Sequence, residues 1–372
     1  MATNRSIPFK ATHPGYILKE ELKERGIKQN EFSKTIGVAP SNLNEVIKGK
    51  RNVTPELALK LEKHLDVPSG LWLRLQSQYE CDLIRIAERD KEEVAARAYE
   101  KECGEFVLLP KLCKALGIEA ERATDRIKQL ELLFDFLLSE SFQVERSTLG
   151  LYRKSDKRLT DEKAMRTWQL IVYAKARQMP LPSVSYQNGN GMVAAQRIAA
   201  LANKQSLTIE KIKSVLAEAG IMYLEVEKLN KAPIDAYSRL LHNGVPLIAV
   251  TYRFNDMDKL AFDILHEICH IEKHLSKVDE AFISLDGSEY SNDPKEIEAN
   301  TFARDILIPP AMWKAILKNE TDSLAVHHVI NLLAKNAEKH GISQSIAVAR
   351  YKHDNDFYRT KVYQSPKIKE KP

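Results

Sequence analysis

The run His266-Glu267-Ile268-Cys269-His270 follows the apolar segment Leu260–Leu265 and continues through His274 to Leu275. Residues four apart lie about one turn apart on the same side of an α-helix, so His266 and His270 can aim their imidazoles at one metal ion. Glu267 projects beside them, where its carboxylate can take a proton from a metal-bound water. The stretch therefore predicts a helix that carries a metal site.

This spacing is the H-E-x-x-H pattern of zinc peptidases, in which two histidines hold the metal and the glutamate is the general base. The alternative is a pair of satisfied core or surface histidines without a metal. The surroundings favour the metal, because two histidines and a glutamate are costly to bury in an apolar helix unless they are ligated or paired.

A catalytic zinc needs a third protein ligand. The longer pattern with a glycine three residues after the second histidine is absent, because Lys273 stands there. A carboxylate on a second helix is the usual alternative, and Asp293–Leu307 is the best candidate. Asp293 fits its N-cap, and Glu296 fits the capping-box position, which gives Glu296 a structural role.

The predicted buried side of this second helix is Ile297, Phe302, Ala303, Ile306 and Leu307. Glu298 lies beside that side, and we therefore expect Glu298 to be the third ligand. Glu280, Asp286 and Glu289 are weaker candidates in the intervening segment. His274 is left out, because as a ligand it would have to reach past His270.

The segments Leu265–Ile271 and Glu296–Pro309 together resemble the ImmA/IrrE metallo-endopeptidases. The similarity spans about residues 207–320 and extends more loosely to Tyr351. It implies an α+β zincin-like domain with His266, His270 and Glu298 as ligands and Glu267 as the catalytic base. Two histidines and one glutamate favour Zn²⁺, with Mn²⁺ as the alternative.

Two further questions stay open around the motif. Cys269 stands where a glycine is common in that family, and a thiol there is either a redox-sensitive group or, as we favour, a small apolar core residue. An oxyanion stabiliser is also needed beside the metal. Tyr237 and Tyr252 are candidates on neighbouring predicted strands.

The N-terminal part, from His13 to Tyr79, is dense in short helical patterns. Helices are expected up to Gly26, over 29–36, over 40–48, from the cap Thr54 to Leu65, and over 68–78. The second and third, joined by residues 37–39, form a helix-turn-helix signature. The third helix would then enter the major groove of DNA.

The expected DNA-binding residues fall into two groups. Polar side chains on the outer face of the third helix can read bases, while residues at the helix ends can neutralise phosphates. They are Ser41, Asn42, Asn44 and Lys48 in the first group, and Lys28, Gln29, Lys50 and Arg51 in the second. The alternative is a small helical bundle for protein contact.

Four motifs in order, which begin at His13, Ile27, Gly49 and Leu71, resemble the HigA-type antitoxins among the XRE helix-turn-helix regulators. The resemblance covers about residues 10–80. It implies a DNA-binding domain that acts on a double-stranded operator, usually as a homodimer.

Composition sets the broad class. The chain has 372 residues, 44% hydrophobic and 29% charged, and a net charge of +5, which are ordinary values for a globular protein. Residues 1–80 hold 13 Lys+Arg against 9 Asp+Glu, or +4, a weak sign of nucleic-acid contact. The four cysteines show no C-x-x-C spacing, and no signal peptide or membrane span is expected. We expect a cytoplasmic protein with reduced thiols and no membrane partner.

The predicted fold is mainly α with a small sheet, divided into four parts. Residues 1–80 form the all-α helix-turn-helix domain, 81–205 a helical spacer, 206–358 the metallopeptidase domain with a helical C-terminal part, and 359–372 a loose tail. A small antiparallel sheet is expected from Ile221–Val226, Ala236–Leu241 and Val245–Tyr252, with a turn at Asn243-Gly244.

The leading hypothesis is a DNA-binding regulator whose zinc-dependent endopeptidase domain cleaves a repressor or antitoxin, or the chain itself, in a stress or toxin-antitoxin response. The alternative is a non-proteolytic repressor or antitoxin with a structural or sensory metal site. A weaker third hypothesis is a scaffold that neutralises a small toxin.

Overall fold

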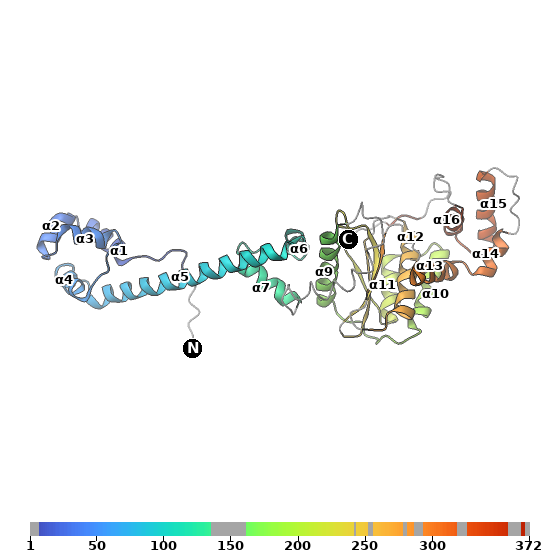
Figure 1. Ribbon diagram of the computed structural model, residues 1–372, viewed down its shortest axis with the longest axis horizontal. Helices are drawn as coiled ribbons and strands as arrows, with labels where there is room; N and C mark the ends of the chain where they lie inside the picture. Colours follow the sequence, from blue (N-terminus) through green and yellow to red (C-terminus); the bar gives the residue numbers. More distant parts are fainter. Residues whose placement is uncertain are drawn as a thin grey trace. The chain divides into compact units, whose positions relative to one another are not determined.

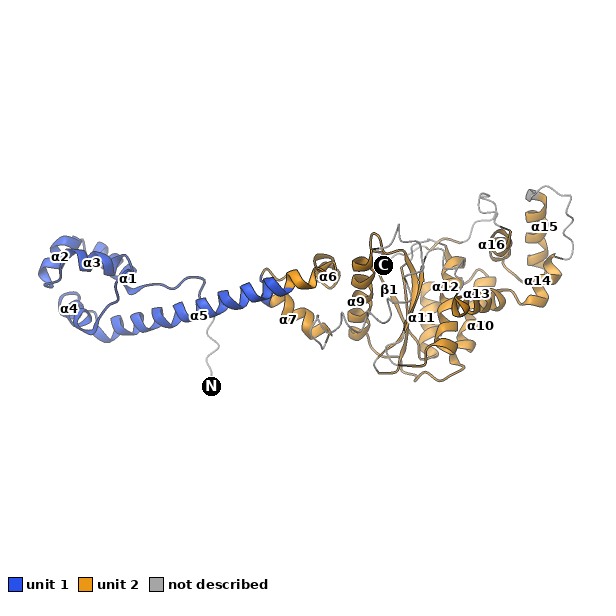
Figure 2. Ribbon diagram, viewed as in Figure 1, with its two compact units in different colours: residues 1–99, 122–124 blue, residues 100–121, 125–372 orange. Residues whose placement is uncertain are grey.

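The computed structural model describes residues 7–134, 161–241, 243–251, 256–277, 281–285, 293–317, 326–355 and 366–368. The chain divides into two compact units, residues 1–99 with 122–124 and residues 100–121 with 125–372 (Figure 2). The predicted boundary at residue 80 falls inside the first unit, and the one at 205 falls inside the second.

The first unit contains five helices in the described residues: α1 (Pro14–Glu24), α2 (Gln29–Thr35), α3 (Pro40–Ile47), α4 (Pro55–Leu65) and most of α5 (Ser69–Cys103). Proline begins α1, α3 and α4, and the Thr54 side chain caps α4 by accepting from Leu57 N. Leu18, Leu43, Leu61 and Trp72 lie in one shared core. The short helices predicted from the sequence are confirmed.

Helix α5 is longer than the last helix predicted for this domain. The pattern predicted separate helical segments before and after about residue 80, whereas α5 continues for 35 residues to Cys103. The charged sequence after Tyr79 contains no glycine or proline until Gly104, and nothing in it therefore interrupts the helix.

The helical part of the second unit begins with α6 (Leu109–Ala115) and the greater part of α7 (Ala123–Phe134), followed by α9 (Glu162–Gln178), α10 (Asn190–Asn203) and α11 (Ile209–Glu218). Ala195 and Ile198 of α10 share one core with α11 and with the sheet. The segment predicted as a separate spacer thus supplies part of the core beside the metal motif.

The sheet has four strands in the order β1-β3-β2-β4: β1 (Met222–Glu225), β3 (Pro246–Val250), β2 (Ile234–Leu240) and β4 (Ala281–Leu285). β1 pairs parallel with β3, while β2 pairs antiparallel with both β3 and β4. The sheet is therefore mixed, and the predicted all-antiparallel sheet is wrong. β4 lies in the segment between the two predicted site helices, where no strand was predicted from the sequence.

Two helical elements carry the motif, α12 (Met257–Cys269) and the π-helical turn η2 (His270–His274). The sheet has α9 on one side and α12 on the other (Figure 1). α13 (Pro294–Leu307) packs against α12, and Asp293 caps it by accepting from Lys295 N at 2.9 Å.

The C-terminal helices are α14 (Pro310–Leu317), α15 (Val326–Lys339) and α16 (Gln344–Asp354). Residues 366–368 contradict the predicted loose tail. Ile368 is buried in the core, and Pro366 O accepts a hydrogen bond of 2.9 Å from Met257 N at the start of α12. Ile368 in the core, the backbone bridge between Asp256 and Lys367 and the ion pair of their side chains together anchor this segment. Among the described helices, none is long and apolar enough to cross a membrane.

Candidate metal centre and helix-turn-helix surface

The two motif histidines lie one turn apart and are both buried, with exposures of 2% for His266 and 0% for His270. Their Nε2 atoms face each other at 3.0 Å. Nδ1 of His266 lies 2.9 Å from Oδ1 of Asn300 on α13. Because that oxygen can only accept, a neutral His266 carries its proton on Nδ1 and leaves Nε2 with a free lone pair.

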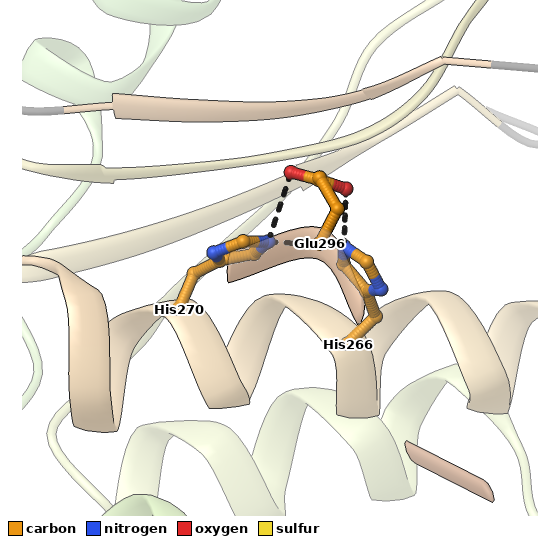
Figure 3. A group of neighbouring side chains, drawn as sticks. All are labelled: His266, His270 and Glu296. Atoms are coloured by element: carbon orange, nitrogen blue, oxygen red, sulfur yellow. Dashed lines mark hydrogen bonds and ion pairs between the residues drawn. The ribbon is translucent and has the colours of Figure 1, made fainter. Parts of the chain in front are cut away.

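Glu296, on α13, is the carboxylate that meets the two histidines. Its oxygens lie 3.3 Å from His266 Nε2 and 3.5 Å from His270 Nε2, and Figure 3 shows it facing both rings. Among the described residues, His266, His270 and Glu296 form the one group whose potential ligand atoms all lie within 4.8 Å of each other. The predicted third ligand, Glu298, is not part of this group.

Glu298 instead contacts the end of η2. Its Oε1 accepts from Lys273 Nζ at 2.7 Å, and its Oε2 lies 3.1 Å from His274 Nε2. In the structure Glu296, and not the predicted Glu298, faces the two histidines. The prediction chose Glu298 because it placed the buried face of α13 on the wrong side of the helix. Ile297 was taken as buried, yet it is 50% exposed.

The true inward face of α13 repeats with helical spacing. Its buried members are Ala299, Asn300, Phe302, Ala303 and Leu307. Glu296 lies three and four residues before Ala299 and Asn300, on the same face. Asp293 alone caps the helix start in the observed contacts, and the Glu296 carboxylate points to the histidines.

These three residues fit a tetrahedral metal ion. Metal–ligand distances near 2.1 Å place neighbouring ligand atoms of a tetrahedron about 3.4 Å apart. The two histidine Nε2 atoms lie 3.0 Å apart, and each lies close to that value from a different oxygen of Glu296, 3.3 Å from Oε2 for His266 and 3.5 Å from Oε1 for His270. Two imidazole nitrogens and one carboxylate are also the donor set of a catalytic zinc site with one open position.

Glu267 lies beside the histidines and is fully buried. Ser284 Oγ on β4 donates to its Oε1 at 2.6 Å. Burial raises the pKa of this carboxyl to about 7, although the neighbouring His266 acts in the opposite direction. A base with a pKa near the working pH is well matched to proton transfer.

β4 supplies a second contact to the centre. Phe282 stacks on His270, with ring centroids 4.2 Å apart and planes inclined by 13°. Phe282, Ser284 and Asn300 were not predicted from the sequence, and His274 was considered there only as a ligand. The signal for β4 was the short apolar run Ala281–Leu285, and the spacing of Asn300 four residues after Glu296 was the signal for the α13 face.

The other candidates around the motif are placed as follows. Cys269 is fully buried in the core, and burial raises the pKa of its thiol to about 12. Tyr237 packs edge-on against Trp168 of α9, with centroids 5.9 Å apart, on the sheet face away from α12. It therefore does not reach the centre. Tyr252, Glu280, Asp286 and Glu289 lie outside the described residues.

In the first unit, α2 and α3 form the helix-turn-helix. The apolar face of α3 is buried through Leu43, Val46 and Ile47. The eight predicted DNA-binding side chains are all exposed or half-buried: Lys28, Gln29, Ser41, Asn42, Asn44, Lys48, Lys50 and Arg51. Arg51 is paired with Glu45 at 2.9 Å.

Comparison with known proteins divides the chain in the same two parts. A family model described as Helix-turn-helix matches residues 18–72, and one described as IrrE N-terminal-like domain, a peptidase family, matches residues 220–352. Virulence-associated protein I of Dichelobacter nodosus is 35% identical over 85 residues, which cover 23% of this chain and 76% of that protein.

Two further similarities each cover less than a quarter of the chain. The uncharacterized HTH-type transcriptional regulator YddM of Escherichia coli is 35% identical over 66 residues, which cover 18% of this chain and 70% of that one. The solved Pseudomonas aeruginosa antitoxin HigA with the higBA promoter is 26% identical and has a TM-score of 0.21. That match covers 23% of this chain and 92% of the antitoxin chain.

The folds and matches define a DNA-binding helix-turn-helix regulator domain joined to a metallopeptidase-type domain. The chain belongs to the helix-turn-helix family through its N-terminal part. Its residues 220–352 match the family model described as IrrE N-terminal-like domain.

Proposed function

We propose that the protein is an operator-binding transcriptional regulator with a zinc-dependent endopeptidase domain. The cleaved protein is a partner repressor or antitoxin, or the chain itself, in a stress or toxin-antitoxin response. The observation that carries this proposal is the meeting of His266, His270 and Glu296 beside the buried Glu267. These residues lie in a chain that also contains a helix-turn-helix domain.

In this proposal His266, His270 and Glu296 hold the metal. A zinc ion held there would supply Lewis acidity, which lowers the pKa of a bound water and polarises a carbonyl. Glu267 would serve as the general base that takes up a proton and returns it to the leaving amine. Ser284 orients Glu267 through its 2.6 Å hydrogen bond, and Asn300 holds His266 in the tautomer whose Nε2 is free.

The helix-turn-helix is proposed to bind the operator as a homodimer. Ser41, Asn42, Asn44 and Lys48 would lie on the base edges, with Lys28, Gln29, Lys50 and Arg51 near phosphates. Each of these side chains is exposed or half-buried, which supports this reading. Loss of Asn42 or Asn44 is expected to weaken specific binding, while loss of Lys50 is expected to reduce its salt dependence.

The test uses the full chain, with zinc content measured alongside cleavage of the regulator encoded next to its gene and cleavage of the chain itself. Glu267→Gln is expected to keep its zinc and to lose about 10²- to 10⁴-fold in cleavage rate, because the general base is removed. Undiminished cleavage by Glu267→Gln would refute the mechanism.

A second function is favoured by the burial of the centre. Glu267 and His270 are both 0% exposed, as suits a structural or sensory metal in a non-proteolytic repressor or antitoxin. This alternative predicts no cleavage product and an operator gel shift that persists in His266→Ala. Co-purification of a small toxin would show that the protein acts as an antitoxin within this alternative.

A further inference from the structure

We infer that His274 and Glu298 form a positioning pair that fixes the tautomer and ring orientation of His270. The inference rests on the proposed metal site, and it assigns a role to two residues that hold no metal themselves. Three polar contacts in series carry it: His270 to His274, His274 to Glu298, and Glu298 to Lys273.

The proton positions follow from the acceptors. His274 Nε2 lies 3.1 Å from a Glu298 carboxylate oxygen, which accepts only, so His274 carries a proton on Nε2. A neutral His274 then has a free lone pair on Nδ1. That Nδ1 lies 2.8 Å from Nδ1 of His270, and His270 must therefore donate.

This arrangement leaves Nε2 of His270 without a proton. It is the atom that faces His266 and Glu296. The other motif histidine reaches the same state through Asn300. Both imidazoles therefore present a free Nε2 to one point, and each is held there by a different partner. Outer partners of this kind fix ring orientation and raise ligand basicity in metal sites.

The local fold holds the pair in place. His274 is 8% exposed and ends the π-helical turn, in which Leu275 N donates to His270 O at 2.8 Å. Lys273 Nζ donates to the other oxygen of Glu298 at 2.7 Å. The Glu298 side chain is 47% exposed, so the series of contacts runs from the buried centre to solvent.

A structural role and a positioning role for His274 lead to different predictions for its removal. If His274 only fills space, its loss lowers stability and leaves the intrinsic zinc affinity of the folded protein unchanged. If it positions His270, zinc affinity falls even where the protein stays folded.

The test measures zinc affinity of the full chain by competition with a chromogenic chelator. His274→Ala is expected to bind zinc about 10- to 100-fold more weakly, the usual effect of removing an outer partner of a ligand. Glu298→Ala is expected to lower the zinc affinity by about three- to tenfold. Because Glu298 is exposed, this variant provides the test if His274→Ala fails to fold. His340→Ala makes the same change at an exposed histidine directly after α15 and is expected to leave affinity unchanged.

A second readout follows the proton directly. Nitrogen-15 NMR of labelled histidines in the metal-free protein should show His270 protonated on Nδ1 in the wild type and a mixture of tautomers in His274→Ala. His274→Gln, whose amide oxygen can accept the same proton, should recover part of the zinc affinity.

Two outcomes would overturn the inference in distinguishable ways. Equal zinc affinity in the wild type, His274→Ala and Glu298→Ala would remove the role of the pair and leave the metal site standing. A wild-type protein that binds no zinc would remove the proposed metal site, and the inference with it.

Discussion

Glu296 and Glu298 lie two residues apart on α13 and have different neighbours. Glu296 faces two buried imidazoles, whereas Glu298 pairs with Lys273 and His274 at the surface. Two residues on an α-helix differ by about 200° around the axis, so the two carboxylates cannot exchange roles without turning the helix.

This difference gives a prediction for the two alanine variants. Glu296→Ala should lose stoichiometric zinc, because it removes one of three ligands. Glu298→Ala should still bind one zinc per chain when zinc is in excess, although more weakly. Metal analysis after dialysis against excess zinc checks both expectations. If Glu298→Ala contained no zinc and Glu296→Ala contained one zinc per chain, Glu298 and not Glu296 would be the third ligand.

At the scale of the element, α1 and α3 touch through a position that accepts no side chain. A Cβ at Gly15 of α1 would lie 1.8 Å from the carbonyl oxygen of Val46 on α3. That atom belongs to the backbone of the helix that carries the proposed base contacts. The close approach of α1 and α3 therefore requires a glycine at position 15, because any other residue has a Cβ there.

Gly15→Ala is expected to destabilise the first unit by about 3 kcal/mol or more, because neither backbone can yield cheaply. The matched change Gly70→Ala, where the nearest atom is the flexible Arg74 side chain at 3.7 Å, should be neutral or stabilising by up to about 1 kcal/mol. Thermal melting of the full chain measures both. A Gly15→Ala protein that melts like the wild type would contradict the packing.

The sequence predicted those elements whose signals are local. The spacing of His266 and His270, the cap at Thr54 and the caps and prolines of the short helices each depend on a few adjacent residues. The parallel pairing of β1 with β3 is not local, because turn signals report only on segments that follow each other. To predict the buried face of α13, one has to decide whether Ile297 or Ala299 points into the core. Hydrophobicity alone favours Ile297, whereas Ala299 is the buried residue.

At the scale of the molecule, each unit has its own core, with Leu43 and Trp72 in the first and Ala195, Ile264 and Ala303 in the second. The sequence correctly predicted the two functional parts, a helix-turn-helix and a metallopeptidase-type domain. The boundaries at residues 80 and 205 stay a prediction. A charged helical segment such as 80–103 has the same pattern in a linker as in a longer helix, and in the structure it continues α5.

Separate cores predict separate responses to metal removal. Zinc at about 100 times its Kd stabilises the fold that binds it by about 2.7 kcal/mol. A chelator should therefore lower the melting transition of the second unit by roughly 5–10 °C and leave that of the first unchanged.

Scanning calorimetry of the full chain measures these transitions. The Gly15→Ala variant identifies the transition of the first unit, because only that one should fall. A chelator that shifts both transitions equally, or neither, would contradict a zinc site confined to the second unit.

The burial of Cys269 has a practical consequence. Its thiol lies within the motif helix and ionises only near pH 12 while buried, so alkylating reagents can modify it only when α12 opens. A Cys81→Ser background removes the exposed thiol. In that background the rate of Cys269 labelling, measured by mass spectrometry, reports how often the centre opens. A partner that opens the centre to a substrate should increase this labelling rate.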